Sequence, residues 1–138
     1  MAENRLQIEL SAPSHPPVVF EADEVSIPGT AGVFTVLPGH TPLLTTLNSG
    51  VIATFEGDSP SRAFAVHQGF AEVLANRITI LANTLELAES IDSSRAEAAA
   101  ERARERLRLR EEETDIVRAE ASLARSLARL QAQSGRTF

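Results

Sequence analysis

The residues most able to do chemistry in this chain are the arginines of its last third. Residues 91–138 hold ten of the thirteen arginines, and the chain contains no lysine. On a helix that turns about 100° per residue, six of these arginines gather in two narrow bands. The bands are Arg95, Arg102 and Arg106, followed by Arg118, Arg125 and Arg129. Because guanidinium groups match phosphate oxygens bidentately, two such bands predict the binding of a phosphate-bearing ligand.

A second interpretation of the arginines is a solvated helix surface, where charges at this spacing usually lie. Arg104 and Arg108 fall among Glu97 and Glu101, so ion pairs between residues three positions apart account for them. Clustered guanidinium groups without equal acid nearby repel one another unless an anion is present. For the arginines of the two bands, the sequence leaves both interpretations open.

Other kinds of site lack the residues that they need. The chain has no cysteine, which excludes disulfides and thiolate sites, and without lysine it has no Gly-x-x-x-x-Gly-Lys phosphate loop. His15, His40 and His67 lie in separate segments without metal-ligand spacing, and His40 is interpreted as a structural hydrogen-bonding residue. No Ser/His/Asp or paired-carboxylate arrangement stands out. We therefore expect no metal, no catalytic cofactor and no catalysis by this chain alone.

Two helices are predicted to carry the arginines. The first has a small-residue stripe and the second an apolar stripe: Ala96, Ala99, Ala100, Ala103 and Leu107, then Ile116, Ala119, Leu123, Leu127 and Leu130. Asp92 or Ser90 would cap the first helix, and Thr114, in an acidic run that suits a turn, would cap the second. Because alanine lets helices approach closely, we expect an antiparallel hairpin of modest stability that can open or repack.

Before Glu89 the apolar pattern has period two. Alternating residues such as Leu6, Ile8 and Leu10 recur on short segments, and turn residues separate these segments about every 8–12 positions. Such a pattern is typical of short strands whose apolar faces pack against each other. It predicts an antiparallel β-sandwich.

Net charge changes at the same point of the chain. Residues 1–90 carry a net charge of −7, whereas residues 91–138 carry +1. We therefore expect two domains, a β-sandwich over residues 1–88 and an antiparallel α-helical hairpin over residues 89–138. No apolar run approaches the roughly 20 residues that cross a bilayer, and the N-terminus lacks the apolar region of a signal peptide. The sequence thus predicts a soluble protein that is not exported by that route.

Residues 32–45 (GVFTVLPGHTPLLT) resemble a hallmark of the epsilon subunit of F-type ATP synthases. Pro38 and Pro42 lack ladder donors and Gly39 permits unusual backbone angles, so a sharp corner between two strands is expected here. Residues 69–73 (GFAEV) are similar to the family's Gly-Gly-Phe-x-Glu-Val strand, with Gln68 in place of the first glycine. Together with the helical tail, the resemblance covers nearly the whole chain.

Residues 91–96 (IDSSRA) resemble the Ile/Leu-Asp-x-x-Arg-Ala motif of bacterial epsilon subunits that bind ATP in their helical hairpin. The family's site also uses an upstream glutamate, an arginine seven residues past the motif arginine, and an arginine pair on the second helix. The resemblance implies an ATP site made of Glu86, Ile91, Asp92, Arg95, Ala96, Arg102, Arg125 and Arg129. Arginines would neutralise the phosphates, while Glu86 and Asp92 would read the adenosine end. The alternative for Asp92 is a helix cap paired with Arg95.

The resemblance further implies a non-catalytic subunit of the central stalk. The sandwich would bind the gamma subunit near the c-ring and help couple ion-driven rotation to ATP synthesis. The hairpin would permit ATP hydrolysis when folded beside the sandwich and inhibit it when extended into the alpha/beta head. ATP would act as a regulatory ligand that favours the folded form. The expected location is the cytoplasmic face of a bacterial plasma membrane, as a peripheral subunit, with the plastid thylakoid as the alternative.

Two other functions are compatible with parts of this pattern. An arginine-rich hairpin could track nucleic-acid phosphates, but the hairpin nets only +1 and the other domain is strongly acidic, so no nucleic-acid partner is expected. Alternatively, the chain could be an epsilon subunit whose hairpin is purely structural and does not bind nucleotide. Titration with ATP distinguishes this last alternative from an ATP-binding hairpin.

Overall fold

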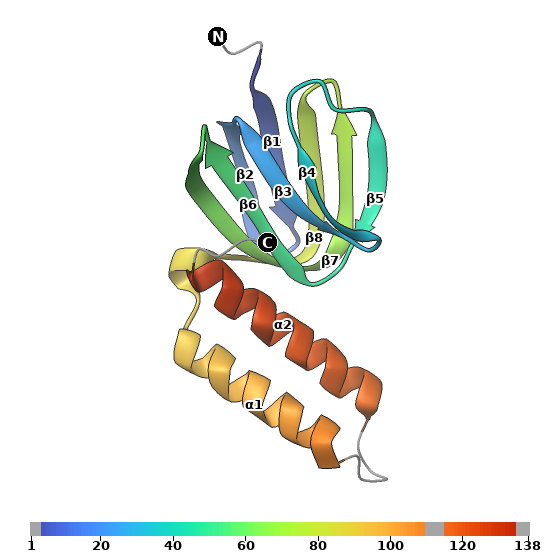
Figure 1. Ribbon diagram of the computed structural model, residues 1–138, viewed down its shortest axis with the longest axis vertical. Helices are drawn as coiled ribbons and strands as arrows, with labels where there is room; N and C mark the ends of the chain where they lie inside the picture. Colours follow the sequence, from blue (N-terminus) through green and yellow to red (C-terminus); the bar gives the residue numbers. More distant parts are fainter. Residues whose placement is uncertain (1–3, 110–114, 135–138) are drawn as a thin grey trace.

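The computed structural model describes residues 4–109 and 115–134, which form eight strands followed by two helices (Figure 1). In chain order the elements are β1 (Leu6–Ala12), β2 (His15–Ala22), β3 (Glu24–Gly29), β4 (Gly32–Val36), β5 (Leu43–Leu47), β6 (Gly50–Glu56), β7 (Ser59–Leu74), β8 (Arg77–Leu87), the short 3-10 turn η2 (Ala88–Ser90), α1 (Ser93–Leu109) and α2 (Ile116–Ser134). The predicted order of a β-sandwich and then a helical hairpin is confirmed.

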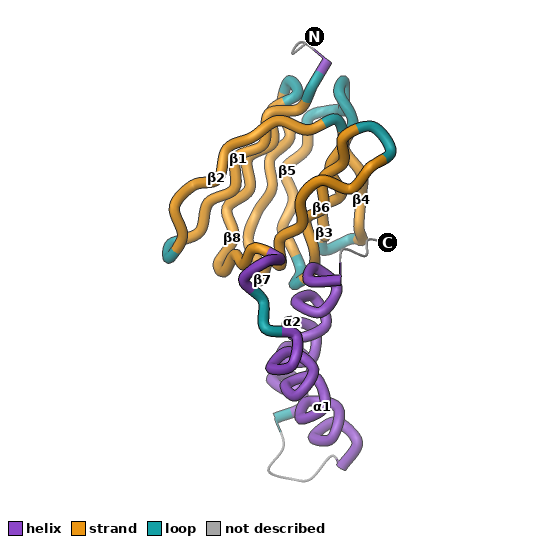
Figure 2. The backbone as a smooth tube through the Cα atoms, turned by 90° about the vertical axis from the view of Figure 1, so that its left-hand side faces the viewer, coloured by secondary structure: helices purple, strands orange, loops and turns teal. Residues whose placement is uncertain are grey.

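The strands form one continuous sheet that curls into two facing layers (Figures 1 and 2). Along the sheet the order is β2-β1-β8-β7-β5-β3-β4, and β6 pairs with both β3 and β7. Among the described residues, every strand pair is antiparallel except β1 with β8, which is parallel. This pair is an exception within the predicted antiparallel β-sandwich. It joins β1 to a strand that lies seventy residues later in the chain, as the pairing of Ile8 with Ile78 shows.

The core lies between the two layers and follows the predicted alternation. Leu6, Ile8 and Leu10 of β1 are fully buried, whereas Gln7 and Glu9 between them are exposed. Ile78 and Ile80 of the neighbouring β8 belong to the same core. Because successive side chains of a strand point to opposite faces, this alternation places one face of each strand inside the sandwich.

The predicted corner lies between β4 and β5. Gly39 has a φ of 90°, in the left-handed region that glycine adopts without strain. Its N–H donates a hydrogen bond to Oδ1 of Asn76 at 2.7 Å, which ties the corner to the β7–β8 turn. His40 contacts the carbonyl oxygen of Thr41 through Nδ1 at 2.6 Å, in agreement with a structural role.

Strand β7 changes partner where the sequence carries Gln68 in place of a glycine. Residues 59–66 pair with β6, while residues 69–73 pair with β5. At the change, Gln68 and Gly69 have φ angles of 64° and 138°. Gln68 therefore adopts a left-handed conformation that costs about 1 kcal/mol for a residue with a Cβ. The chain thus changes strand partner at this place without the glycine, and Gln68 adopts the left-handed conformation at that cost in free energy.

The two helices form the predicted hairpin, and their caps follow the sequence in part. The Oδ1 of Asp92 accepts a hydrogen bond from the N–H of Arg95 at 3.1 Å, so Asp92 caps α1. Ser90 instead donates to the carbonyl of Leu87 at 2.9 Å. Asp115 caps α2 in the same way as Asp92 caps α1, at 3.0 Å. The predicted cap Thr114 and the turn before it lie outside the described residues.

Helix α2 lies between the sandwich and α1 (Figure 1). Ala96, Ala100 and Ala103 of α1 are buried, as the small-residue stripe predicted. On α2 the apolar stripe is only partly covered, because Ile116 and Leu127 are exposed. Burial instead occurs on two sides of α2, one that includes Ala119 and Ser126, and one that includes Ala128 and Ala132.

The second buried side of α2 packs against the outer face of the sandwich. Ala132 belongs to a small apolar cluster with Val51, Ala53 and Ala65 of β6 and β7. Arg125 and Arg129 lie on this same side of α2, beside Ala128 and Ala132. At about 100° per residue, these arginines lie on the opposite side of α2 from Leu123 and Leu127. The sequence did not reveal that this face is turned toward the sandwich.

Candidate functional site

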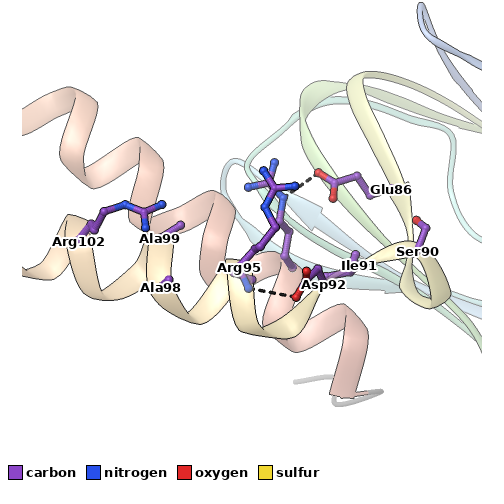
Figure 3. Close-up of a pocket in the computed structure, with 10 residues that line it drawn as sticks. Glu86, Ser90, Ile91, Asp92, Arg95, Ala98, Ala99 and Arg102 are labelled. Carbon is purple, nitrogen blue, oxygen red and sulfur yellow. Dashed lines mark hydrogen bonds and ion pairs between the residues drawn. The ribbon is translucent and has the colours of Figure 1, made fainter.

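A pocket of about 530 Å³ lies where β8, η2, α1 and α2 meet (Figure 3). Seven of the eight predicted site residues line it: Glu86, Ile91, Asp92, Arg95, Ala96, Arg102 and Arg129. Ser90, Ala98 and Ala99 complete the lining. The eighth predicted residue, Arg125, does not belong to this lining and lies one helical turn before Arg129 on α2.

The chain brings these residues together through the short connection between β8 and α1. Glu86 is the penultimate residue of β8, and the 3-10 turn η2 follows directly. Ile91 then packs against the apolar cluster between α2 and the sandwich. Because Asp92 caps α1, the helix starts at a defined place, and positions 95 and 102 lie on the same face, two turns apart.

Glu86 is the carboxylate that joins the sandwich to the hairpin. Its Oε1 accepts a hydrogen bond from Nε of Arg129 at 2.8 Å, and the two side chains are 26% and 31% exposed. The same oxygen lies 3.2 Å from Nε2 of His67 on β7. Among the described residues no hydrogen bond reaches Oε2, so this oxygen is available to a ligand.

Positive charge exceeds negative charge around the pocket. Three guanidinium groups line it, against the carboxylates of Glu86 and Asp92. Within residues 4–109 and 115–134, no ion pair reaches the guanidinium of Arg95 or Arg102. The contrast with Arg104 is direct, because Arg104 pairs with Glu101 three positions earlier at 2.8 Å. The pairing interpretation is thus correct for Arg104, while the pocket arginines retain unused binding capacity for an anion.

His67 is a residue of this region that the sequence reasoning missed. It is 4% exposed and lies on the face of β7 that α2 covers. A signal was present in the sequence, because residues 63–66 (AFAV) just before His67 form a continuous apolar run, and such a run indicates burial on both faces of a strand. Burial is the main cause that lowers the pKa of His67, and the positive charges of Arg129 and Arg125 lower it further. Glu86 acts in the opposite direction and raises it. His67 is therefore neutral in the folded chain at neutral pH.

The lowered pKa of His67 predicts a loss of stability in acid. Because the folded pKa lies below the ordinary value of 6.5, the unfolded chain binds more protons between these two values. The contribution of His67 to the free energy of unfolding should therefore be complete above pH 6.5. It should be lost as the pH falls from 6.5 through the folded pKa of His67. Urea unfolding of the full chain at a series of pH values measures this. The loss of stability in acid that is due to His67 is the difference between the parent chain and His67→Gln. If the free energy of unfolding changed with pH in the same way in both proteins, the prediction would be contradicted.

Comparison with known proteins identifies the family. Residues 5–88 match the family model described as "ATP synthase, Delta/Epsilon chain, beta-sandwich domain", and residues 89–133 match "ATP synthase, Delta/Epsilon chain, long alpha-helix domain". The chain belongs to the epsilon family of F-type ATP synthase stalk subunits. The resemblance found in the sequence is thereby confirmed.

Relatives of this epsilon-family chain are similar over nearly their whole length. The ATP synthase epsilon chain of Moorella thermoacetica is 41% identical over 127 residues, which cover 92% of this chain and 95% of the relative. The ATP synthase epsilon chain 1 of Syntrophotalea carbinolica is 40% identical over 128 residues, with 92% of each chain covered. The chain of Symbiobacterium thermophilum is 45% identical over 111 residues, covering 80% of this chain and 79% of that one.

A solved structure shares the fold of this epsilon-family chain. A chain in the cryo-EM structure of Euglena gracilis mitochondrial ATP synthase superposes with a TM-score of 0.78 at 22% identity. The match covers 94% of this chain and 81% of that chain. Within the described residues, no helix is long and apolar enough to cross a membrane. In the same residues, no group of three or more histidine or carboxylate side chains is placed to hold a metal ion.

Proposed function

We propose that this epsilon-family chain is an ATP-sensing subunit whose hairpin binds ATP in the pocket beside Glu86. The observation that carries the proposal is the convergence of arginines from both helices with a carboxylate of the sandwich on one pocket. Its volume of about 530 Å³ lies within the range of pockets that hold drug-sized ligands. ATP is a regulatory ligand in this proposal and not a reactant, so the chain contributes no catalytic group.

The arginines bind the phosphates in the proposed complex. Arg95 and Arg102 of α1 have no acidic partner among the described residues, and a triphosphate would supply one. Arg129 uses Nε for Glu86, which leaves its two terminal amino groups for phosphate oxygens. Arg125 is also kept in the proposed site, because it precedes Arg129 by one turn and is in reach of a ligand that extends along α2.

The polar groups at the other end of the pocket bind the nucleoside. Oε2 of Glu86 is open to a hydroxyl or amino donor, and Asp92 lines the same pocket while its Oδ1 caps α1. Ile91 and the alanines of α1 supply apolar surface for a base or ribose. Arg129 would bridge Glu86 and the phosphates in this arrangement, and its positive charge would offset the repulsion between them.

Bound ATP stabilises the folded hairpin in this proposal. The arginines of α1 and α2 reach one triphosphate only while the two helices lie side by side. A ligand shifts an equilibrium by its difference in affinity between the two states, so ATP favours the folded form. When ATP is scarce, the hairpin opens, extends along the gamma subunit into the alpha/beta head and inhibits ATP hydrolysis. The same arginines then meet acidic groups of the catalytic subunits.

The sandwich has a surface suited to partner subunits. Leu44, Phe70, Leu74 and Leu81 are exposed large apolar residues on β5, β7 and β8. Phe70 and Leu81 are direct partners across the β7–β8 pair, so they lie side by side on the outer face. A patch of this kind marks an interaction site. We propose that the sandwich binds the gamma subunit and the c-ring, which would hold the chain at the cytoplasmic face of the membrane and couple ion flow to rotation.

Isothermal titration of the full chain with ATP tests the proposed function. We expect a saturable heat with one ATP per chain. Absence of heat up to millimolar ATP, with the hairpin folded, would instead support an epsilon subunit whose hairpin is purely structural. One observation favours this second candidate, because Glu86, Asp92 and Arg129 already have partners within the protein. A nucleotide-dependent change in the distance between labels on the sandwich and on α1 would report the coupling to hairpin folding.

A further inference from the structure

His67 lies behind the pocket and contacts one of its residues. It is on β7, diagonally across from Glu86 on β8, since Ala65 pairs with Glu86 and His67 pairs with Thr84. Both side chains therefore point to the same outer face, the face that α2 covers. His67 does not line the pocket itself. Its only described polar contact is with Oε1 of Glu86, at 3.2 Å.

The direction of this hydrogen bond follows from the chemistry of the two groups. A carboxylate has no proton to donate, so Nε2 of His67 must carry the hydrogen and donate it to Glu86. Nδ1 is then the unprotonated nitrogen, and it is buried without a partner among the described residues. A second proton on Nδ1 would have no acceptor in this place, which keeps the ring in a single neutral tautomer.

We propose that His67 is a positioning residue of the nucleotide pocket, which holds the Glu86 carboxylate so that its free oxygen can accept a hydrogen bond from the nucleoside. This inference rests on the proposed function, since it assigns His67 a task in ATP binding. Two donors, His67 from β7 and Arg129 from α2, converge on Oε1. Together they fix the carboxylate from two elements and leave Oε2 for the ligand.

A neutral histidine suits this task better than a charged residue. A lysine or an arginine at position 67 would place another buried cation beside Arg125 and Arg129. These two arginines of α2 already lower the pKa of His67. It would also neutralise Glu86 and weaken its attraction for a polar hydrogen of the ligand. The imidazole instead supplies one directed hydrogen bond without a charge. On this outer face of β7, Ala65 is small and apolar, so His67 is the donor that the strand contributes.

The first arm of the test compares ATP affinities of full-length variants at about pH 8, where histidine is neutral. His67→Leu fills similar space without a donor, and we expect it to weaken ATP binding about tenfold, as for the loss of a hydrogen bond to a charged group. His67→Gln retains a donor and should bind within about twofold of the parent chain. His15→Leu is the matched control and should leave ATP affinity unchanged, because His15 lies on β2 outside the pocket lining and its Nδ1 contacts the carbonyl oxygen of Pro16.

The second arm asks whether His67 acts through Glu86. In a double-mutant cycle, His67→Leu should weaken binding about tenfold in the parent chain but less than about twofold in a Glu86→Ala background. Equal losses in both backgrounds would show a role in packing alone and overturn the inference. If His67→Leu does not fold, His67→Asn serves in its place, because the shorter amide does not reach Glu86.

The outcomes separate this inference from the proposed function. If the parent chain binds ATP and His67→Leu binds it equally well, only the role of His67 is overturned. If the parent chain binds no ATP, both proposals fall together. Weak binding by His67→Leu that His67→Gln restores supports both.

Discussion

Replacing Arg102 with alanine should weaken ATP binding by the full chain about 10- to 150-fold, which corresponds to the 1.5–3 kcal/mol of a hydrogen bond to a charged group. Arg102 lines the pocket, and no ion pair reaches its guanidinium within the part of the chain that the structure describes. Its side chain is therefore free to take phosphate oxygens. Isothermal titration of Arg102→Ala with ATP measures the effect directly.

The matched control for this prediction is Arg104→Ala, two residues along the same helix. Arg104 pairs with Glu101 on the surface of α1 and does not line the pocket. Both variants remove one positive charge from α1, so long-range attraction of ATP falls equally in both. Affinity should therefore stay near that of the parent chain in Arg104→Ala. Similar losses in the two variants, both removed by added salt, would point to diffuse electrostatics instead of a built site.

Replacing Gly69 with alanine should destabilise the sandwich by about 3–5 kcal/mol, much of the total stability of a small domain. A Cβ at Gly69 would lie 2.0 Å from the carbonyl oxygen of Leu81, and that oxygen belongs to the backbone of β8. The φ of +138° at this position is also strained for any residue that carries a Cβ. The free energy of unfolding, measured with urea, should fall accordingly.

Gly57→Ala separates the close contact from the backbone conformation. Gly57 also has a positive φ, +61°, but no atom lies within 4 Å of where its Cβ would be. We expect this variant to lose only about 1 kcal/mol, the cost of the left-handed conformation. The difference between the two variants then reports the clash with Leu81 together with the additional strain of a φ of +138°. A loss at Gly69 no larger than that at Gly57 would show that β8 moves aside without cost.

The candidate site was predictable to the extent that it depends on local sequence. Asp92 caps α1 because a carboxylate before a helix accepts the first free N–H groups, whatever the rest of the chain does. Arg95 and Arg102 share a face because residues seven apart on a helix lie nearly above one another. Glu86 and Arg129 were added only by the resemblance to the family's site, and these two residues line one pocket with Arg95 and Arg102.

The surroundings of the site were not predictable in the same way. The apolar run before His67 indicates that something covers the outer face of β7, but it does not tell that α2 is the element that buries His67. The same docking turns the side of α2 that carries Arg125 toward the sandwich, although it leaves Arg125 outside the pocket lining. The parallel pairing of β1 with β8 likewise joins strands that are far apart in the chain.

By itself, the sequence determined the β-sandwich, the helical hairpin that follows it, the start of α1 and the shared face of Arg95 and Arg102. Only the tertiary structure decided which outer face of the sheet is covered, which α2 face covers it, and that His67 and Arg129 share one oxygen of Glu86. The reason is physical. Periodicity and caps depend on neighbours within a few residues, whereas the partner of an exposed-looking face is set by how distant segments pack together.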